Sequence, residues 1–139
     1  MLDLGIFADK LARNSRRAIL RAEQEADGQG HTQLIPEQVI ATIAELEPAL
    51  FREVVTQLGH DAQQSLNEIQ AKIGTYQNRK KHIGLSEEMR WLLHYSLIEA
   101  HRHERRRIEP EDFLCVYFAR KRKQSLGEKL RNLFRGRSS

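Results

Sequence analysis

The sequence predicts an all-α fold in which two pseudo-symmetric repeats together contain about seven to eight helices. Apolar residues recur with helical spacing along almost the whole chain, and only 3 prolines and 8 glycines occur in it. The phrase "LIPEQVI" at 34–40 returns as "IEPEDFL" at 108–114, which lies 74 positions later. Because this register holds without a gap between 11–44 and 85–118, the chain contains an internal duplication.

The first helix of each repeat is predicted from its amphipathic spacing. In the second repeat Ser86 is a suitable N-cap, and Glu87 and Glu88 suit the positive end of the helix dipole. The apolar stripe behind them consists of Met89, Leu92, Leu93, Leu97 and Ala100. The first repeat has a smaller stripe at the same phase, made of Leu11, Ser15, Ala18, Ile19, Ala22 and Ala26.

The second helix of each repeat is predicted to begin at the repeated phrase. Pro36 and Pro110 suit the first helical turn, where the N–H that proline lacks would have no helical partner. The apolar residues behind the two prolines correspond in pairs, Val39, Ile40 and Ile43 with Phe113, Leu114 and Tyr117. The repeated phrase therefore marks the same helix start twice.

The remaining helices are predicted from their end signals. A third helix begins near Pro48 and stops at Gly59, and a fourth runs from the cap residue Asp61 to Gly74. Near the C-terminus, "SLGEKLRNLF" predicts one short amphipathic helix with Leu126, Leu130, Leu133 and Phe134. The expected organisation is a single domain over 1–139, divided into repeat one 11–74, a linker 75–84, repeat two 85–134 and a basic tail 135–139.

The net charge of +4 is unevenly distributed along the chain. Residues 1–74 contain 7 Lys/Arg and 11 Asp/Glu, whereas residues 75–139 contain 16 and 8. A basic half of this kind can meet nucleic acid, an anionic membrane or an acidic protein, or can simply be a solvated surface. No apolar run approaches the ~20 residues of a membrane span, and the N-terminus lacks the pattern of a secretory signal. A cytoplasmic protein with no membrane partner is expected.

An enzymatic function is not expected. None of the 6 histidines forms an H-E-x-x-H pair, and the single Cys115 excludes an internal disulfide and a zinc site built on thiolates. Cys115 lies between Leu114 and Val116, where a buried core thiol is a more frequent role than a nucleophile. Neither a metal nor a cofactor is expected, and no catalytic residue is assigned.

Two longer stretches, "EQEADGQGHTQLIPEQVI" at 23–40 and "VVTQLGHDAQQSLNEIQAKIG" at 54–74, carry a family resemblance. Together with the duplication, they resemble the double N-terminal domain of the Clp chaperones, which feed substrates to a protease or disaggregate proteins. The resemblance covers residues 11–119. It implies non-catalytic binding of proteins or peptides, so we expect a chaperone-related adaptor or regulator of Clp-type protein quality control.

The chain departs from the family's pattern at several positions. Glu104 and Arg105 stand where Gly-His is usual in the second loop, and proline replaces threonine before the glutamate of both repeats. Gln38 and Asp112 replace the histidine that usually follows that glutamate. A Clp chaperone continues into ATPase modules, but no G-x-x-x-x-G-K-[ST] phosphate loop occurs here, so a free-standing N-domain is expected.

The resemblance also implies candidate binding residues. In the family, the glutamate of each repeat's second-helix motif can hold the guanidinium of phosphorylated arginine on client proteins, and this glutamate corresponds to Glu37 and Glu111. A carboxylate at a helix start also lies near free backbone N–H groups that can bind phosphate. The alternative role is an interaction with the helix dipole alone, and the missing threonine favours it. We expect both glutamates near the surface, related by a pseudo-twofold axis.

An apolar stripe on the outer face of the second repeat's first helix is a candidate protein interface. It consists of Trp91, Tyr95 and Ile98, whereas the first repeat has Arg17, Arg21 and Gln24 at the matching positions. Two explanations remain open at this point. Either the predicted C-terminal helix covers the stripe, or the stripe binds a partner or a second copy of the chain as a homodimer.

Two basic runs indicate a different class of function. The basic patch consists of Arg102, Arg105, Arg106, Arg107, Arg120, Lys121, Arg122 and Lys123. It would suit a nucleic-acid-associated regulator, but only 6% of the chain is aromatic and no stacking motif accompanies the arginines. A protein or peptide partner, such as a Clp ATPase or its clients, is therefore the main expectation, and nucleic acid is the alternative.

Overall fold

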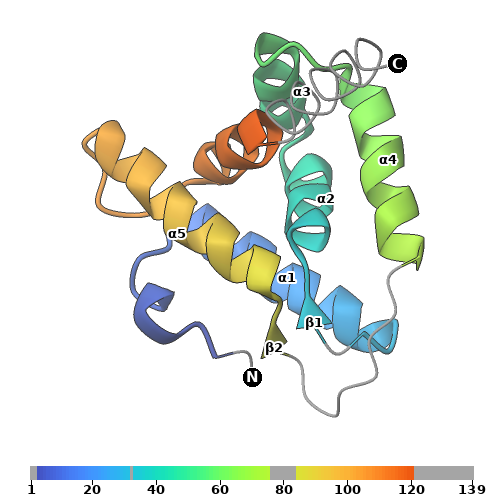
Figure 1. The fold of residues 1–139 in the computed structure, drawn as a ribbon, viewed down its shortest axis with the longest axis horizontal. Helices are drawn as coiled ribbons and strands as arrows, with labels where there is room; N and C mark the ends of the chain where they lie inside the picture. The colour runs from blue at the N-terminus through green and yellow to red at the C-terminus, as the bar shows by residue number, and fades with distance from the viewer. Residues whose placement is uncertain (1–2, 32, 76–83, 121–139) are drawn as a thin grey trace, which may run out of the picture.

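The computed structural model describes residues 3–31, 33–75 and 84–120, which are mostly helical (Figure 1). The elements in chain order are η1 (Gly5–Phe7, a 3-10 helix), α1 (Arg13–Gly28), β1 (Gln33–Leu34), α2 (Pro36–Leu46), α3 (Pro48–Gln57), α4 (Ala62–Thr75), β2 (Gly84–Leu85), α5 (Glu87–Arg102) and a further helix at 110–120. The all-α prediction is confirmed, although β1 and β2 form a short parallel pairing that the sequence pattern did not indicate. Residues 76–83 of the predicted linker, the predicted C-terminal helix and the basic tail lie outside the described residues.

The two described helices of the second repeat reproduce the first two helices of the first repeat at an offset of 74 residues. α1 and α5 correspond residue for residue, as do α2 and the 110–120 helix. The N–H of Ala12 donates to the carbonyl of Ile108 at 2.9 Å. At the equivalent place, the N–H of Ser86 donates to the carbonyl of Leu34 at 3.1 Å. Each repeat therefore donates one backbone hydrogen bond to the equivalent carbonyl of the other repeat, as a pseudo-twofold relation requires.

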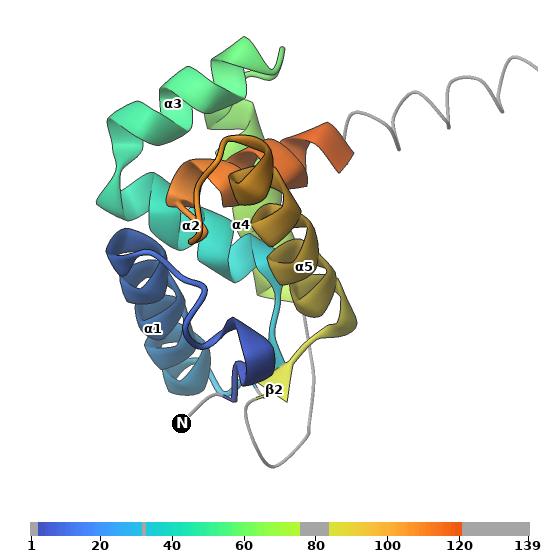
Figure 2. The ribbon, with the colours of Figure 1, turned by 90° about the vertical axis from the view of Figure 1, so that its left-hand side faces the viewer.

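The central helix is α2, which contacts α1, α3, α4 and α5. Figure 1 shows it between α5 and α4, and Figure 2 shows α1 and α5 to either side of it. Val39 and Ile40 of α2 are fully buried, and so are their counterparts Phe113 and Leu114 in the 110–120 helix. All four belong to one hydrophobic cluster, so the two repeats bury their apolar faces in a shared core.

The helix starts follow the local signals in the sequence. The side chain of Ser86 accepts a hydrogen bond from the N–H of Met89 at 3.0 Å, as an N-cap should. The side chain of Asp61 accepts from the N–H of Gln64 at 2.8 Å, three residues further along. These two caps are confirmed, and each satisfies a backbone donor that the first helical turn leaves without a partner.

The predicted helix ends are confirmed at one glycine and wrong at another. Pro48 begins α3, and Gly59 follows the end of that helix with a φ of +83°, a left-handed conformation that suits glycine. The fourth helix does not stop at Gly74, because α4 continues to Thr75. Since Gly74 has an ordinary helical conformation, it lowers the helix propensity there without ending the helix.

The loop after α5 contains a strained residue at the place of a glycine. Glu104 has a φ of +61°, and its counterpart in the first repeat is Gly30, with a φ of +76°. The two loops close with the same bond, from His31 to Ala26 in one repeat and from Arg105 to Ala100 in the other. The backbone path is therefore retained, although a residue with a Cβ atom is unfavourable in this conformation.

Replacing Glu104 with glycine is expected to raise the free energy of unfolding by up to about 1 kcal/mol, because it relieves the left-handed strain. The reciprocal change, Gly30→Glu, is expected to lower it by about 1 kcal/mol, since open space surrounds Gly30 and only its φ is unfavourable. Denaturant unfolding of both variants measures the two effects. A less stable Glu104→Gly variant would show that the Glu104 side chain contributes more than its strain removes.

Within the described ranges, no helix combines the length and the apolar character needed to cross a membrane.

Candidate functional site

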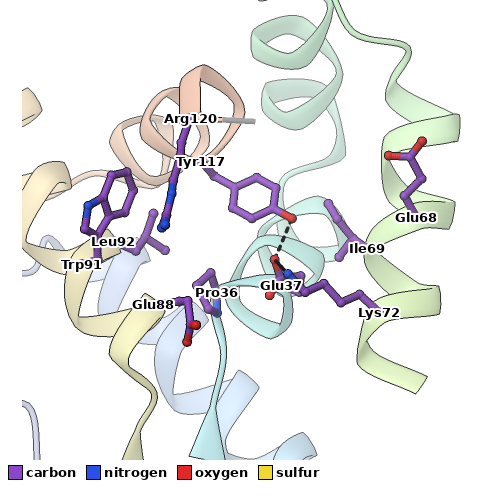
Figure 3. A pocket seen from close by; sticks show the side chains of 10 residues that line it. All are labelled: Pro36, Glu37, Glu68, Ile69, Lys72, Glu88, Trp91, Leu92, Tyr117 and Arg120. Carbon is purple, nitrogen blue, oxygen red and sulfur yellow. Dashed lines mark hydrogen bonds and ion pairs between the residues drawn. The ribbon is translucent and has the colours of Figure 1, made fainter. Parts of the chain in front are cut away.

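A pocket of about 370 Å³, here called the junction pocket, opens where the two repeats meet (Figure 3). α2 and α4 form one side of it, and α5 and the 110–120 helix form the other. Its apolar and aromatic lining consists of Pro36, Ile69, Trp91, Leu92 and Tyr117. Its charged lining consists of Glu37, Glu68, Lys72, Glu88 and Arg120. A cleft with ring faces and a few convergent charges is the usual form of a binding site.

Glu37 lies in the wall of the junction pocket and is buried, with 4% of its surface exposed. The hydroxyl of Tyr117 donates to its Oε2 atom at 2.8 Å, and the Nζ atom of Lys72 lies 3.3 Å from the same oxygen. The expectation that Glu37 lies near the surface is therefore wrong. The reason is that α4 and the 110–120 helix cover the first turn of α2 and supply the partners that a buried carboxylate needs.

The hydroxyl of Tyr117 is fixed as a donor to Glu37. Burial raises the pKa of Tyr117 far above its ordinary value, and the neighbouring charge of Glu37 raises that pKa further. Tyr117 is therefore protonated at neutral pH and above. Figure 3 shows its ring extending from the second repeat towards Glu37, so this bond ties the 110–120 helix to α2.

Trp91 and Arg120 form the opposite part of the junction pocket. The guanidinium carbon of Arg120 lies 4.1 Å from the centre of the Trp91 ring, which is a cation–π contact. Trp91 also contacts Tyr95 with ring centres 4.5 Å apart. Tyr95 and Ile98 keep 43% and 45% of their surface exposed, so this stripe is accessible among the described residues. The C-terminal helix that was predicted as its alternative cover lies outside them.

Glu111 has a different environment from Glu37, although each glutamate directly follows the proline that begins its helix. Its side chain is 46% exposed, which confirms the expected position near the surface at a helix start. Its Oε1 atom lies 2.8 Å from Arg105, a residue of the preceding loop. The two motif glutamates therefore offer unequal access, since one carboxylate is enclosed and the other is at the surface.

A partly buried ion pair between the half-buried Arg105 and the buried Asp112 closes the loop of the second repeat. The two terminal nitrogens of the guanidinium donate to the two carboxylate oxygens of Asp112 at 3.1 and 2.9 Å. The N–H of Glu109 donates to the same carboxylate at 2.8 Å. In the first repeat the neutral Gln38 takes this position and accepts from the N–H of Ile35 at 3.0 Å. The second repeat thus uses a charged version of the same helix cap.

The buried carboxylate of Asp112 gives the stability a pH dependence of defined sign. Burial raises its pKa above the ordinary value, against the lowering effects of the Glu109 N–H and of Arg105. Between the ordinary and the raised pKa, the folded state binds more protons than the unfolded state, so this group's contribution to stability decreases as the pH rises through that window.

Wild-type protein is therefore expected to gain thermal stability relative to Asp112→Asn as the pH falls from neutral towards about 4. Asparagine is the matched variant because it can still accept from the Glu109 N–H but does not titrate. Unfolding midpoints of both proteins over a series of pH values measure the difference. A relative loss for the wild type on acidification would mean that Arg105 outweighs burial and holds the pKa below its ordinary value.

The described members of the predicted basic patch have different neighbours. Arg102 lies 3.4 Å from Glu99, Arg105 is held by the two acids described above, and Arg120 lies on Trp91. Arg106 and Arg107 are exposed in the loop, and residues 121–123 lie outside the described part of the chain. The nucleic-acid role therefore stays a prediction, and three of the described arginines, Arg102, Arg105 and Arg120, have partners within the chain.

Among the described residues, no group of three His, Cys, Asp or Glu side chains is placed to hold a metal ion. Cys115 is half-buried rather than fully buried, and burial raises the pKa of its thiol, with Glu99 as the next cause. A raised pKa disfavours the thiolate, which is the nucleophilic form.

Comparison with protein-family models identifies the relationship of the chain. The model of the Clp repeat (R) N-terminal domain matches residues 10–133. The chain belongs to this Clp N-terminal domain family. Its members are all-α, non-catalytic domains that bind protein substrates and adaptors, so a protein partner in general follows from membership. Curated protein sequences gave no match.

Several residues of the junction pocket were not predicted from the sequence. Glu68 and Lys72 lie on α4 and face the pocket only because that helix packs along α2. Glu88 was interpreted as a helix-dipole residue and also lines the pocket. Tyr117 was placed among the core positions, and no local signal indicated that its hydroxyl meets Glu37. The candidate Trp91 was interpreted as an interface residue, and it does line this site.

Proposed function

We propose that this protein is a protein- or peptide-binding module that acts as an adaptor or regulator in Clp-type protein quality control. Its proposed partners are a Clp ATPase and the clients of that ATPase, and its proposed location is the cytoplasm. The junction pocket supports the proposal, because it joins both repeats and combines aromatic faces with carboxylates in a domain of a substrate-binding family.

The lining of the junction pocket indicates the chemistry of the bound segment. Arg120 lies on Trp91 within this pocket, so the aromatic wall accommodates a guanidinium group. Leu92 and Ile69 add apolar surface, and Glu88 adds a carboxylate on the side of α5. A client segment that carries both apolar and arginine side chains suits this combination.

A short fluorescein-labelled peptide rich in leucine and arginine tests the proposal by fluorescence anisotropy. Trp91→Ala is expected to weaken its binding at least about tenfold, because tryptophan anchors contribute most of the binding energy at such sites. Ile6→Ala is the matched control, since Ile6 is an exposed apolar residue that does not line the pocket. Equal affinities for both variants and the wild type would refute a client site in the junction pocket.

The adaptor role needs a separate measurement. The purified protein is added to a Clp ATPase and its protease from the same cell, and the degradation rate of an unfolded fluorescent client is followed. A changed rate that Trp91→Ala abolishes is the expected result. An unchanged rate, with peptide binding intact, would retain the binding module and remove the adaptor or regulator role.

Phosphoarginine at Glu37 and Glu111 is part of this proposal. Glu111 is half-exposed and within reach of a ligand, whereas Glu37 must exchange its contacts with Tyr117 and Lys72 to receive one. Titration with free phosphoarginine is therefore expected to depend more on Glu111→Gln than on Glu37→Gln. If neither variant changes the binding, the two glutamates have structural roles only.

A further inference from the structure

A second hollow of about 500 Å³ lies between α5 and the 110–120 helix, on the outer face of the second repeat. We call it the outer groove. Tyr95 and Ile98 line it from α5, and the small residues Cys115 and Ala119 line it from the 110–120 helix. A row of small side chains beside exposed large ones leaves space that another apolar side chain can fill.

In the first repeat, an ion pair spans the two helices at the position that corresponds to the outer groove. There Arg21 of α1 reaches across to Glu45 of α2 at 2.6 Å and also lies 3.5 Å from Glu25. At the offset of 74 residues, Arg21 corresponds to Tyr95 and Glu45 corresponds to Ala119. The second repeat therefore replaces an ion pair across the two helices with an aromatic ring and a methyl group.

The first repeat also shows that a helix can lie beside this face. α4 packs along α2, and its residue Ile73 lines a hollow together with Ala41 of α2. Ala41 is the counterpart of Cys115 in the outer groove. The face that includes Cys115 thus has, in the same chain, a counterpart that packs against an amphipathic helix.

The charges around the outer groove favour an acidic ligand. Arg102 and Arg120 both line the groove. The one carboxylate in the lining, Glu99, already lies 3.4 Å from Arg102 and 3.1 Å from His103. Positive charge therefore remains at the groove, and carboxylates on a partner would meet it at close range.

We propose that the outer groove docks an acidic amphipathic helix of a partner protein. The apolar face of that helix fills the space beside Tyr95, Ile98 and Ala119, and its carboxylates face Arg102 and Arg120. The outer groove adjoins the junction pocket and shares Trp91 and Arg120 with it, but its ligand is different from the client proposed there.

The single tryptophan of the chain provides the measurement, because Trp91 lines the outer groove and contacts Tyr95. The probe is a designed helical peptide without tryptophan that has leucines on one face and glutamates on the other. When this peptide is titrated into the full-length protein, the change in Trp91 emission is expected to saturate. A second peptide with the same leucines and with lysines in place of the glutamates is expected to bind at least about tenfold more weakly.

The matched variant combines Tyr95→Arg with Ala119→Glu and so transfers the ion pair of the first repeat to the second. The fold should tolerate it, because the first repeat contains this pair at the corresponding positions. It is expected to weaken the acidic peptide at least about tenfold, whereas Ile6→Ala, at an exposed apolar residue outside the groove, leaves the affinity unchanged. Should the double variant not fold, Ile98→Gln makes the same test with the residue that the first repeat has at that place.

Four results would overturn the proposal. They are no saturable binding of the acidic peptide, equal binding of the lysine peptide, equal binding by the groove variants, and an equal loss in Ile6→Ala. Sedimentation of the free protein adds a fifth, since a dimer that the groove variants dissociate would identify a second copy as the occupant. Tyr95 and Ala119 line the outer groove but not the junction pocket, whereas Trp91 lines both. The double variant at Tyr95 and Ala119 therefore separates the two proposals, because it is expected to lose the acidic peptide and to keep the leucine and arginine peptide.

Discussion

Replacing Arg105 with alanine is expected to lower the free energy of unfolding by about 3 kcal/mol, because the Asp112 carboxylate then stays buried without its cation. The Asp112 side chain is 1% exposed, and the guanidinium supplies two of its hydrogen bonds. Among the described residues, the N–H of Glu109 is the one hydrogen-bond donor that would remain to it. Denaturant unfolding at neutral pH measures the loss, which should shrink as the pH falls and Asp112 becomes protonated.

Two variants separate this ion pair from ordinary surface charge. Arg102→Ala removes an exposed arginine that pairs with Glu99 on the same helix, and it is expected to change stability by less than about 0.5 kcal/mol. Adding Asp112→Asn to Arg105→Ala should restore most of the loss, since a neutral amide can still accept from Glu109. If Arg105→Ala is as mild as Arg102→Ala, the buried pair contributes no more than a surface pair.

The helices and their starts could be predicted because their signals are local. Ser86 and Asp61 accept the backbone N–H three residues further on, and Pro36 and Pro48 begin their helices. The gapless duplication also predicted that corresponding helices of the two repeats begin and end at equivalent residues. This holds for α1 and α5. A local pattern that occurs twice forms the same local structure twice.

The environment of Glu37 could not be predicted, because its partners are far away in the chain. Lys72 lies 35 residues later and Tyr117 lies 80 residues later. The motif places a glutamate at the same helix position in both repeats, and nothing within the motif decides which of the two is covered. That depends on how α4 and the 110–120 helix pack on α2, which is a tertiary property.

The Arg105–Asp112 pair lies between these two cases. The sequence comparison showed that both residues depart from the family's pattern, and the offset shows that they replace His31 and Gln38 of the first repeat. A carboxylate at a buried helix cap needs a cation, and an arginine appeared in the adjoining loop of the same repeat. Two oppositely charged residues that both depart from the family's pattern in the same repeat therefore indicate an ion pair. In the sequence analysis the two departures were considered separately, and the pair was not predicted.

The other large effect is expected at Phe118, whose replacement by alanine should lower the free energy of unfolding by about 3 to 5 kcal/mol. Phe118 is fully buried, whereas its counterpart in the first repeat is Ala44. Its ring centre lies 6.0 Å from that of Phe51 on α3 and 5.0 Å from that of Tyr117. The alanine variant removes this ring from the contact between α3 and the second repeat, and the cavity that remains adds to the loss.

The comparison of Phe118→Ala with Phe118→Leu separates the cavity from the ring contacts. Leucine fills most of the volume, so its effect is expected to stay below about 2 kcal/mol. The double variant with Phe51→Ala should differ from the sum of the two single variants by about 0.5 to 1.5 kcal/mol, since the two rings contact each other edge to face. Strict additivity would mean that each ring packs independently, and then α3 would not be held to the second repeat through this pair.

Because Tyr117 precedes Phe118 and donates to Glu37, loss of Phe118 should also loosen the junction pocket. Anisotropy of the labelled peptide with the Phe118→Ala variant measures this effect.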